Sequence, residues 1–113
     1  MAVTIEDWGD GIKIVCLIER VDSTNAPETE AAVRALMDQG CTRILFDLSE
    51  LVYISSAGLR VVLLTWKTLS KTGGRFALCR FNDNVRQVFE VSGFLPMFKV
   101  FKEREGALEY LSG

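Results

Sequence analysis

The sequence predicts an α/β fold, a single domain in which a mixed β-sheet is flanked by about four helices. Two observations support this prediction. Apolar runs that suit strands alternate along the chain with segments whose apolar residues recur at helical spacing. The first two runs are separated only by Gly9-Asp10-Gly11, which predicts a hairpin turn. A hairpin followed by strand–helix alternation gives one antiparallel pair and mainly parallel pairing after it.

The chain length and its uniform composition predict one domain over residues 1–113. A chain of 113 residues suits one compact domain, and it shows no internal repeat, low-complexity run or linker. Hydrophobic residues make up 49% and charged residues 25%, which is the balance of a globular protein able to bury a core.

The N-terminal hairpin pairs an edge strand with a central one. Val3 to Trp8 alternates apolar and polar residues, as a half-buried edge strand does. Ile12 to Ile18 is a dense apolar run, which is typical of a strand buried on both faces. We therefore expect the second strand to lie inside the sheet.

The first helix follows the break from Asp22 to Pro27. Asn25 can cap it, with Pro27 in its first turn and Glu28 three residues after the cap. Gly40 ends it. Its apolar residues form a stripe at helical spacing: Ala31, Ala32, Ala35 and Leu36.

The middle of the chain predicts a strand, a loop and a long apolar helix. Arg43 to Leu48 reads as a buried strand, and Leu51 to Ser55 as a connecting loop with buried apolar positions. Ala57 to about Ser70 is apolar almost all round, which predicts a helix packed on several sides.

Four shorter elements complete the alternation after the Gly73-Gly74 turn. They are a strand Arg75–Cys79, a helix from Asn82 or Asp83 to Ser92, a strand Phe98–Phe101 and a helix Glu103–Leu111.

Charge and residue content exclude several classes of function. A formal net charge of −2 argues against a nucleic-acid binder, which needs a basic face. The chain has no histidine, so Ser-His and Cys-His nucleophile mechanisms are excluded and a zinc site is disfavoured. No residue set supports turnover, so we expect a non-enzyme that has no catalytic residues and binds neither metal nor cofactor.

The cysteines and the N-terminus predict a cytoplasmic protein. Cys16, Cys41 and Cys79 are odd in number and form no CxxC pair, which argues against a disulfide framework and for reduced structural thiols. Residues 1–10 contain three acidic residues and no apolar core of a signal peptide. The longest charge-free stretch, residues 51–59, is far shorter than the roughly 20 residues of a spanning helix.

Two serines between a buried strand and a helix form the most unusual motif. Ser55-Ser56 can simply cap the helix, because a serine hydroxyl accepts a hydrogen bond from a free amide of the first turn. A phosphate on Ser56 would also be favoured by these amides and by the helix dipole. Gly58 in the first turn costs about 1 kcal/mol against Ala, so something needs the space that its missing side chain leaves.

These residues, together with the rest of the chain in outline, resemble a known family. Residues 17–22 are similar to its Asp-ended second strand, Asp47-Leu48-Ser49 to a strand end, and residues 54–59 to its phosphorylation loop. Gly106-Ala107-Leu108-Glu109 matches its terminal helix. The sequence thus resembles a STAS domain of the bacterial anti-sigma factor antagonist type.

The resemblance implies a partner-switching function that regulates transcription indirectly. An antagonist of this type binds a serine-kinase anti-sigma factor when it is unphosphorylated, and so releases the sigma factor. The kinase uses ATP to phosphorylate a loop serine, which weakens the complex, and a serine phosphatase reverses the step. Such a protein would be a monomer or weak dimer that contacts neither nucleic acid nor the membrane interior.

The resemblance also assigns site residues. Aligned on residues 57–59, the family's serine falls on Ser56, which we also expect closest to the helix amides, and Ser55 is a second choice. Ser55 stands where many members have Asp, and Glu19 where Gly is common. We expect two neighbouring loops to bind the partner, since both follow the carboxyl ends of parallel strands. Their residues are Asp22, Ser23, Thr24, Asn25, Ser55, Ser56, Ala57, Gly58 and Leu59.

Two other interpretations remain open from the sequence. The chain could be a cytosolic STAS subunit of a membrane transporter or a stress-signalling scaffold, with serines that only cap a helix; neighbouring genes would distinguish these roles. Asp22, Asp47 and Glu50 could form a carboxylate cluster for acid–base or Mg²⁺ chemistry. The competing explanation is that Asp22 and Asp47 end strands by binding turn amides.

Overall fold

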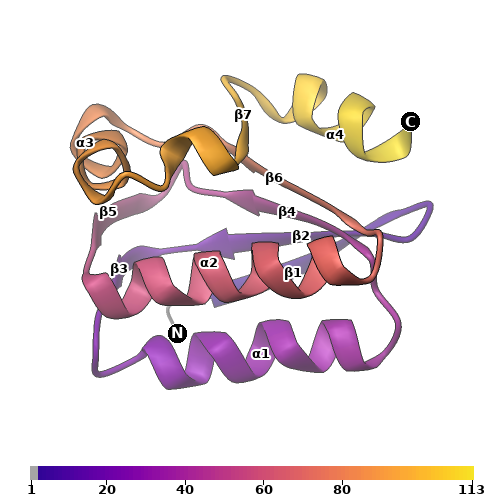
Figure 1. Ribbon diagram of the computed structural model, residues 1–113, viewed down its shortest axis with the longest axis horizontal. Coiled ribbons are helices and arrows are strands. Elements are labelled where there is room, and N and C mark those ends of the chain that lie inside the picture. Colours follow the sequence, from indigo (N-terminus) through magenta and orange to yellow (C-terminus); the bar gives the residue numbers. More distant parts are fainter. Residues whose placement is uncertain (1–2) are drawn as a thin grey trace.

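The computed structural model describes residues 3–113, which form a central sheet between layers of helices (Figure 1). Within these residues the sheet has five strands in the order β1-β2-β4-β6-β7. Strands β1 and β2 are antiparallel and the remaining pairs are parallel, so the predicted mixed sheet is confirmed. The bounds are β1 Val3–Gly9, β2 Ile12–Leu17, β4 Arg43–Asp47, β6 Arg75–Cys79 and β7 Lys99–Phe101.

Helices cover both faces of this sheet, and residues 3–113 hold four α-helices and one 3-10 turn. Helices α1 and α2 run side by side along one face, while α4 lies on the opposite face (Figure 1). None of these helices is both long and apolar enough to cross a membrane. The bounds are α1 Ala26–Asp38, α2 Ser56–Lys71, α3 Asp83–Ser92, η1 Leu95–Met97 and α4 Arg104–Ser112.

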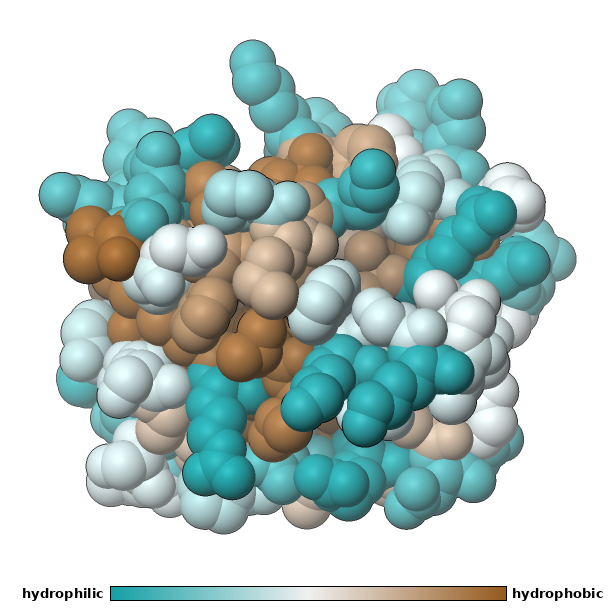
Figure 2. All heavy atoms as spheres, viewed as in Figure 1, coloured by the Kyte–Doolittle hydropathy of each residue, from teal (hydrophilic) through white to brown (hydrophobic). Residues whose placement is uncertain are grey.

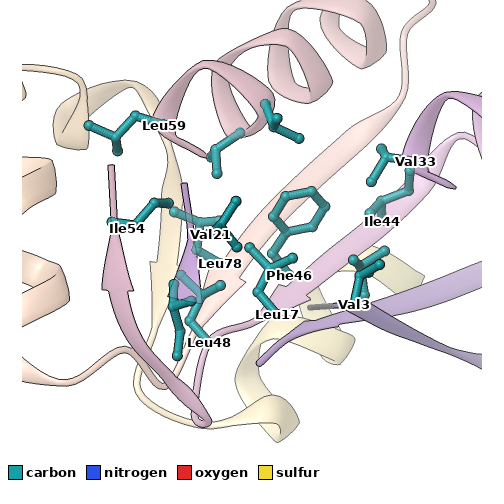
Figure 3. Packing of buried hydrophobic residues seen from close by; sticks show 14 of the residues in the cluster. Val3, Leu17, Val21, Val33, Ile44, Phe46, Leu48, Ile54, Leu59 and Leu78 are labelled. Atoms are coloured by element: carbon teal, nitrogen blue, oxygen red, sulfur yellow. The ribbon is translucent and has the colours of Figure 1, made fainter. Parts of the chain in front are cut away.

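The core is split by the sheet into two clusters. On the α1–α2 face, Figure 3 shows Leu17, Phe46 and Leu78 from three neighbouring strands packing with Ile54 and Leu59. On the other face, the apolar side of α4 packs against β2, β4 and β6. The parallel strands β4 and β6 are buried on both sides, as their dense apolar sequences predict.

A second, two-stranded sheet was not predicted. It pairs β3 (Glu19–Val21) with β5 (Leu51–Ile54) in parallel. The prediction of a loop over residues 51–55 is wrong, and so is the prediction that the second strand runs on to Ile18. The strand ends at Leu17, and Glu19 adopts a φ of 60°, a left-handed conformation that turns the chain toward the second sheet. The family position that commonly carries Gly therefore lies at a bend that favours Gly.

The three cysteines are free thiols, as expected. Cys16 and Cys79 are buried on the central strands, and Cys41 is half-buried. Burial raises the pKa of the Cys79 thiol to about 12, so it stays protonated and unreactive at neutral pH.

Candidate functional site

The small sheet brings the two predicted loops together. Strands β3 and β5 end side by side, with Val21 paired to Ile54. The amide of Ser55 donates to the carbonyl of Val21 at 2.9 Å, which ties the start of one loop to the start of the other. The expected juxtaposition of residues 22–25 and 55–59 is present, although it is built by β3 and β5 and not by the long central strands.

Ser55 and Ser56 have different structural roles. Ser55 is the N-cap of α2, with extended backbone and a hydroxyl that accepts from the Gly58 amide at 3.4 Å. We expected Ser56 closest to the helix amides, but Ser55 makes that contact. Ser56 is the first helical residue and is exposed, and its hydroxyl has no hydrogen-bond partner within residues 3–113. A kinase could therefore reach Ser56 without breaking the cap.

The first turn of α2 presents free amides beside Ser56. Within the described chain, the amides of Ser56 and Ala57 have no acceptor, as expected for the first residues of a helix. The positive end of the helix dipole lies at the same place. Both features would stabilise a negative group on Ser56.

Gly58 is needed for packing, so the expectation that something needs the space of its missing side chain is confirmed. A Cβ at this position would lie 2.6 Å from Cγ1 of Ile54 and 3.0 Å from Cγ1 of Val21. The space that Gly58 leaves is filled by the ends of β3 and β5. It is therefore not left open for a modification, and it lets α2 begin directly on the small sheet.

Asp22 organises the second loop. Its carboxylate accepts from the amide of Thr24 at 3.0 Å and from Nε of Arg20 at 3.0 Å. Hydrogen bonds from the side chain and backbone of Thr24, helped by Arg20, hold the pKa of Asp22 below its ordinary value. Asp22 is therefore a fixed negative charge on the surface at neutral pH.

Asn25 closes this loop and does not cap α1 as the sequence suggested. It precedes α1, but its side chain makes no capping bond. Instead Oδ1 accepts from the amide of Asp22 at 2.9 Å and Nδ2 donates to the carbonyl of Arg20 at 2.9 Å. Ser23 and Thr24 are left exposed at the tip, where a partner could contact them.

The carboxylates considered for catalysis do not form one site. Asp47 is only 1% exposed and accepts from Nε of Arg104 at 2.6 Å and from the amide of Ser49 at 3.0 Å. It ends β4 as a turn-binding, ion-paired residue. Residues 3–113 contain no group of three or more His, Cys, Asp or Glu side chains placed to hold a metal ion.

A groove between α1 and α2 extends the site beyond the predicted loops. It encloses about 390 Å³ and is lined by Ser23 and Ala57 from the two loops, with Arg34 and Arg60 among its charged residues. Figure 2 shows apolar side chains gathered over α2 and hydrophilic ones bordering them on the α1 side. Sequence reasoning missed the α1 wall, where the small residues Ala26 and Ala31 line the groove.

Comparison with known proteins gives one family and one fold. The STAS domain model matches residues 9–107. BtrV of Bordetella bronchiseptica, named as an anti-sigma factor antagonist, is 50% identical over 98 residues, covering 87% of this chain and 84% of BtrV.

Solved structures agree in fold. A Thermotoga maritima protein titled as an anti-sigma factor antagonist superposes with a TM-score of 0.92 at 23% identity, covering 98% of this chain and 95% of the other. The Bacillus cell fate determinant SpoIIAA in its phosphorylated form superposes with a TM-score of 0.77 at 24% identity, covering 96% and 99%.

Proposed function

The chain belongs to the STAS domain family, and from this premise we propose that it is an anti-sigma factor antagonist switched by phosphorylation of Ser56. Unphosphorylated, it binds a serine-kinase anti-sigma factor and so releases the sigma factor. The kinase transfers a phosphoryl group from ATP to Ser56, and a serine phosphatase removes it. Ser55 is the second choice of acceptor.

The observation that carries this proposal is the setting of Ser56. Its hydroxyl is exposed at the first residue of α2, beside two free amides and next to the Asp22 loop. Ser55 already supplies the helix cap, so Ser56 has no capping role of its own. The name of BtrV and the phosphorylated form of SpoIIAA support the same function.

The partner surface combines the two loops and the exposed side of α2. It comprises Asp22, Ser23, Thr24 and Asn25 with Ser55, Ser56, Ala57, Gly58 and Leu59. Gly58 and Leu59 are buried, so they shape this surface from below. A phosphate on Ser56 would add about −1.5 to −2 charges beside the carboxylate of Asp22. Repulsion and the desolvation of a dianion at the interface both oppose binding, while the helix amides keep the fold intact.

The proposal has consequences for the whole chain. Residues 1–113 form one STAS domain, present in the cytoplasm as a monomer or weak dimer. The protein acts by binding other proteins; it needs no cofactor, catalyses no reaction and contacts no nucleic acid.

The test is incubation with ATP and the cognate serine-kinase anti-sigma factor, followed by peptide mass spectrometry. Phosphate on Ser56 is expected, and Ser56→Ala should abolish labelling while Ser55→Ala retains it. Exclusive labelling of Ser55 would show that the wrong serine was chosen. No labelling at all would favour the other function, a STAS subunit of a transporter or a signalling scaffold.

A further inference from the structure

Arg60 lies one helical turn after Ser56 on the exposed side of α2. Both residues are exposed, and they are four positions apart in the same helix. Residues at this spacing have Cβ atoms about 5–6 Å apart. Side chains of an α-helix lean toward its N-terminus, so that of Arg60 leans back toward the turn that holds Ser56.

Arg60 is also free to take a new partner. No carboxylate lies within 4.0 Å of its guanidinium in residues 3–113. The other two arginines around the site are already paired. Arg20 contacts Asp22 at 3.0 Å and Arg34 contacts Glu30 at 3.0 Å.

We propose that Arg60 is the internal binding partner of a phosphate on Ser56, an inference that rests on the proposed modification of that serine. A guanidinium offers two parallel N–H donors to phosphate oxygens, a geometry that a lysine ammonium lacks. With the free amides of Ser56 and Ala57, Arg60 completes a site that holds the phosphate against the first turn of α2.

This pairing links the modification to the groove between α1 and α2. Arg60 is one of the residues that line that groove. When its guanidinium binds the phosphate, one positive charge at the groove is cancelled. Phosphorylation therefore changes the charge of the groove as well as that of the Asp22 loop.

The test uses the full chain carrying phosphoserine at position 56, installed during synthesis so that no kinase is needed. Phosphorus NMR measures the second pKa of this phosphate, ordinarily about 6. The Arg60 guanidinium favours the dianion, so Arg60→Ala should raise that pKa by about 0.5 units. Arg60→Lys should raise it less, because it keeps the charge but loses the paired donors.

Arg34→Ala is the matched control. Arg34 lines the same groove but lies on α1 and is paired with Glu30. The remaining charges around the site, Arg20, Asp22 and Glu30, are the same in all four proteins, so their effect on the comparison cancels. The proposal predicts that Arg34→Ala leaves the phosphate pKa unchanged. It is overturned if Arg60→Ala titrates like the parent, or if Arg34→Ala shifts the pKa as much. Neither result would count against the proposed partner switching. Conversely, a failure of the kinase to label Ser56 would count against partner switching but would not change this titration.

Discussion

At the scale of single residues, the geometry of the site depends most on Gly58, which has no side chain. Gly58 lets the first turn of α2 rest directly on Val21 and Ile54, the last residues of β3 and β5. This contact holds Ser55 at the cap and presents Ser56 to solvent. The positions of both serines follow from the size of residue 58.

We therefore expect Gly58→Ala to destabilise the protein. Alanine is favoured over glycine in a helix by about 1 kcal/mol, but a Cβ 2.6 Å from Ile54 forces the core apart, and such overpacking costs about 1–3 kcal/mol. A net loss of stability of up to about 2 kcal/mol follows, measured by urea unfolding.

Gly106→Ala is the comparison for this prediction. Gly106 is also helical, but a Cβ there would approach only the ring of Phe101, at 3.2 Å. Gly106→Ala is therefore expected to lower the free energy of unfolding less than Gly58→Ala does. A Gly58→Ala protein as stable as the parent would show that the ends of β3 and β5 are not tightly packed against α2.

Motif residues were predictable where their role is local. Ser55, Ser56 and Gly58 could be recognised because a helix start has a characteristic sequence. Asn25 was misread, because its partners, the Asp22 amide and the Arg20 carbonyl, meet it only through a turn of the folded chain. The local sequence around Asn25 is the same whether its side chain caps α1 or closes the loop.

At the scale of elements, an ion pair between an arginine of α4 and a buried carboxylate of the sheet holds α4 in place. Arg104, the first residue of α4, contacts Asp47 at the end of β4 and Glu6 on β1. Burial acts to raise the pKa of Asp47, but hydrogen bonds from Arg104 and Ser49 outweigh it and hold the pKa of Asp47 below its ordinary value. The pair therefore stabilises the folded state while Asp47 is ionised.

The sign of the pH dependence follows from this lowered pKa. The contribution of Asp47 is complete above the unfolded pKa, about 3.9, and is lost as pH falls toward the folded pKa. Asp47→Asn should cost about 1.5–3 kcal/mol at pH 7, since Arg104 loses its buried carboxylate partner and keeps only Glu6. The difference in free energy of unfolding between variant and parent should be smaller at pH 3, as measured by urea unfolding.

The exposed pair of Glu30 and Arg34 supplies the control. Glu30→Gln should change stability by less than about 1 kcal/mol at both pH values. If Asp47→Asn lowered the free energy of unfolding equally at pH 7 and pH 3, that result would contradict the lowered pKa of Asp47.

The elements themselves were predictable according to their length and neighbours. The strands of the central sheet have apolar runs of their own, and the helices have stripes and caps. Strands β3 and β5 have three and four residues and pair with each other across 30 residues of chain. Nothing local distinguishes residues 51–54 from a loop with buried positions. The bend at Glu19 directly follows the apolar run 12–18, and no Gly or Pro marks it.

At the scale of the whole molecule, the layered arrangement places Ser56 away from the buried core. Helices α1 and α2 and the small sheet place Ser56 at one edge, while α4 covers the opposite face of the sheet (Figure 1). A charge added at Ser56 would face solvent and, under the proposed function, the partner. The central claim is therefore that phosphorylation changes binding and leaves the fold unaltered.

Titration calorimetry against the serine-kinase anti-sigma factor tests that claim most directly. Protein carrying phosphoserine at position 56 should bind about 30- to 150-fold more weakly than unmodified protein, equivalent to about 2–3 kcal/mol. Ser56→Ala should bind like the unmodified protein and resist switching, and Ser56→Asp, with a smaller charge, should fall between. Equal affinity of the phosphorylated and unmodified proteins would contradict the account.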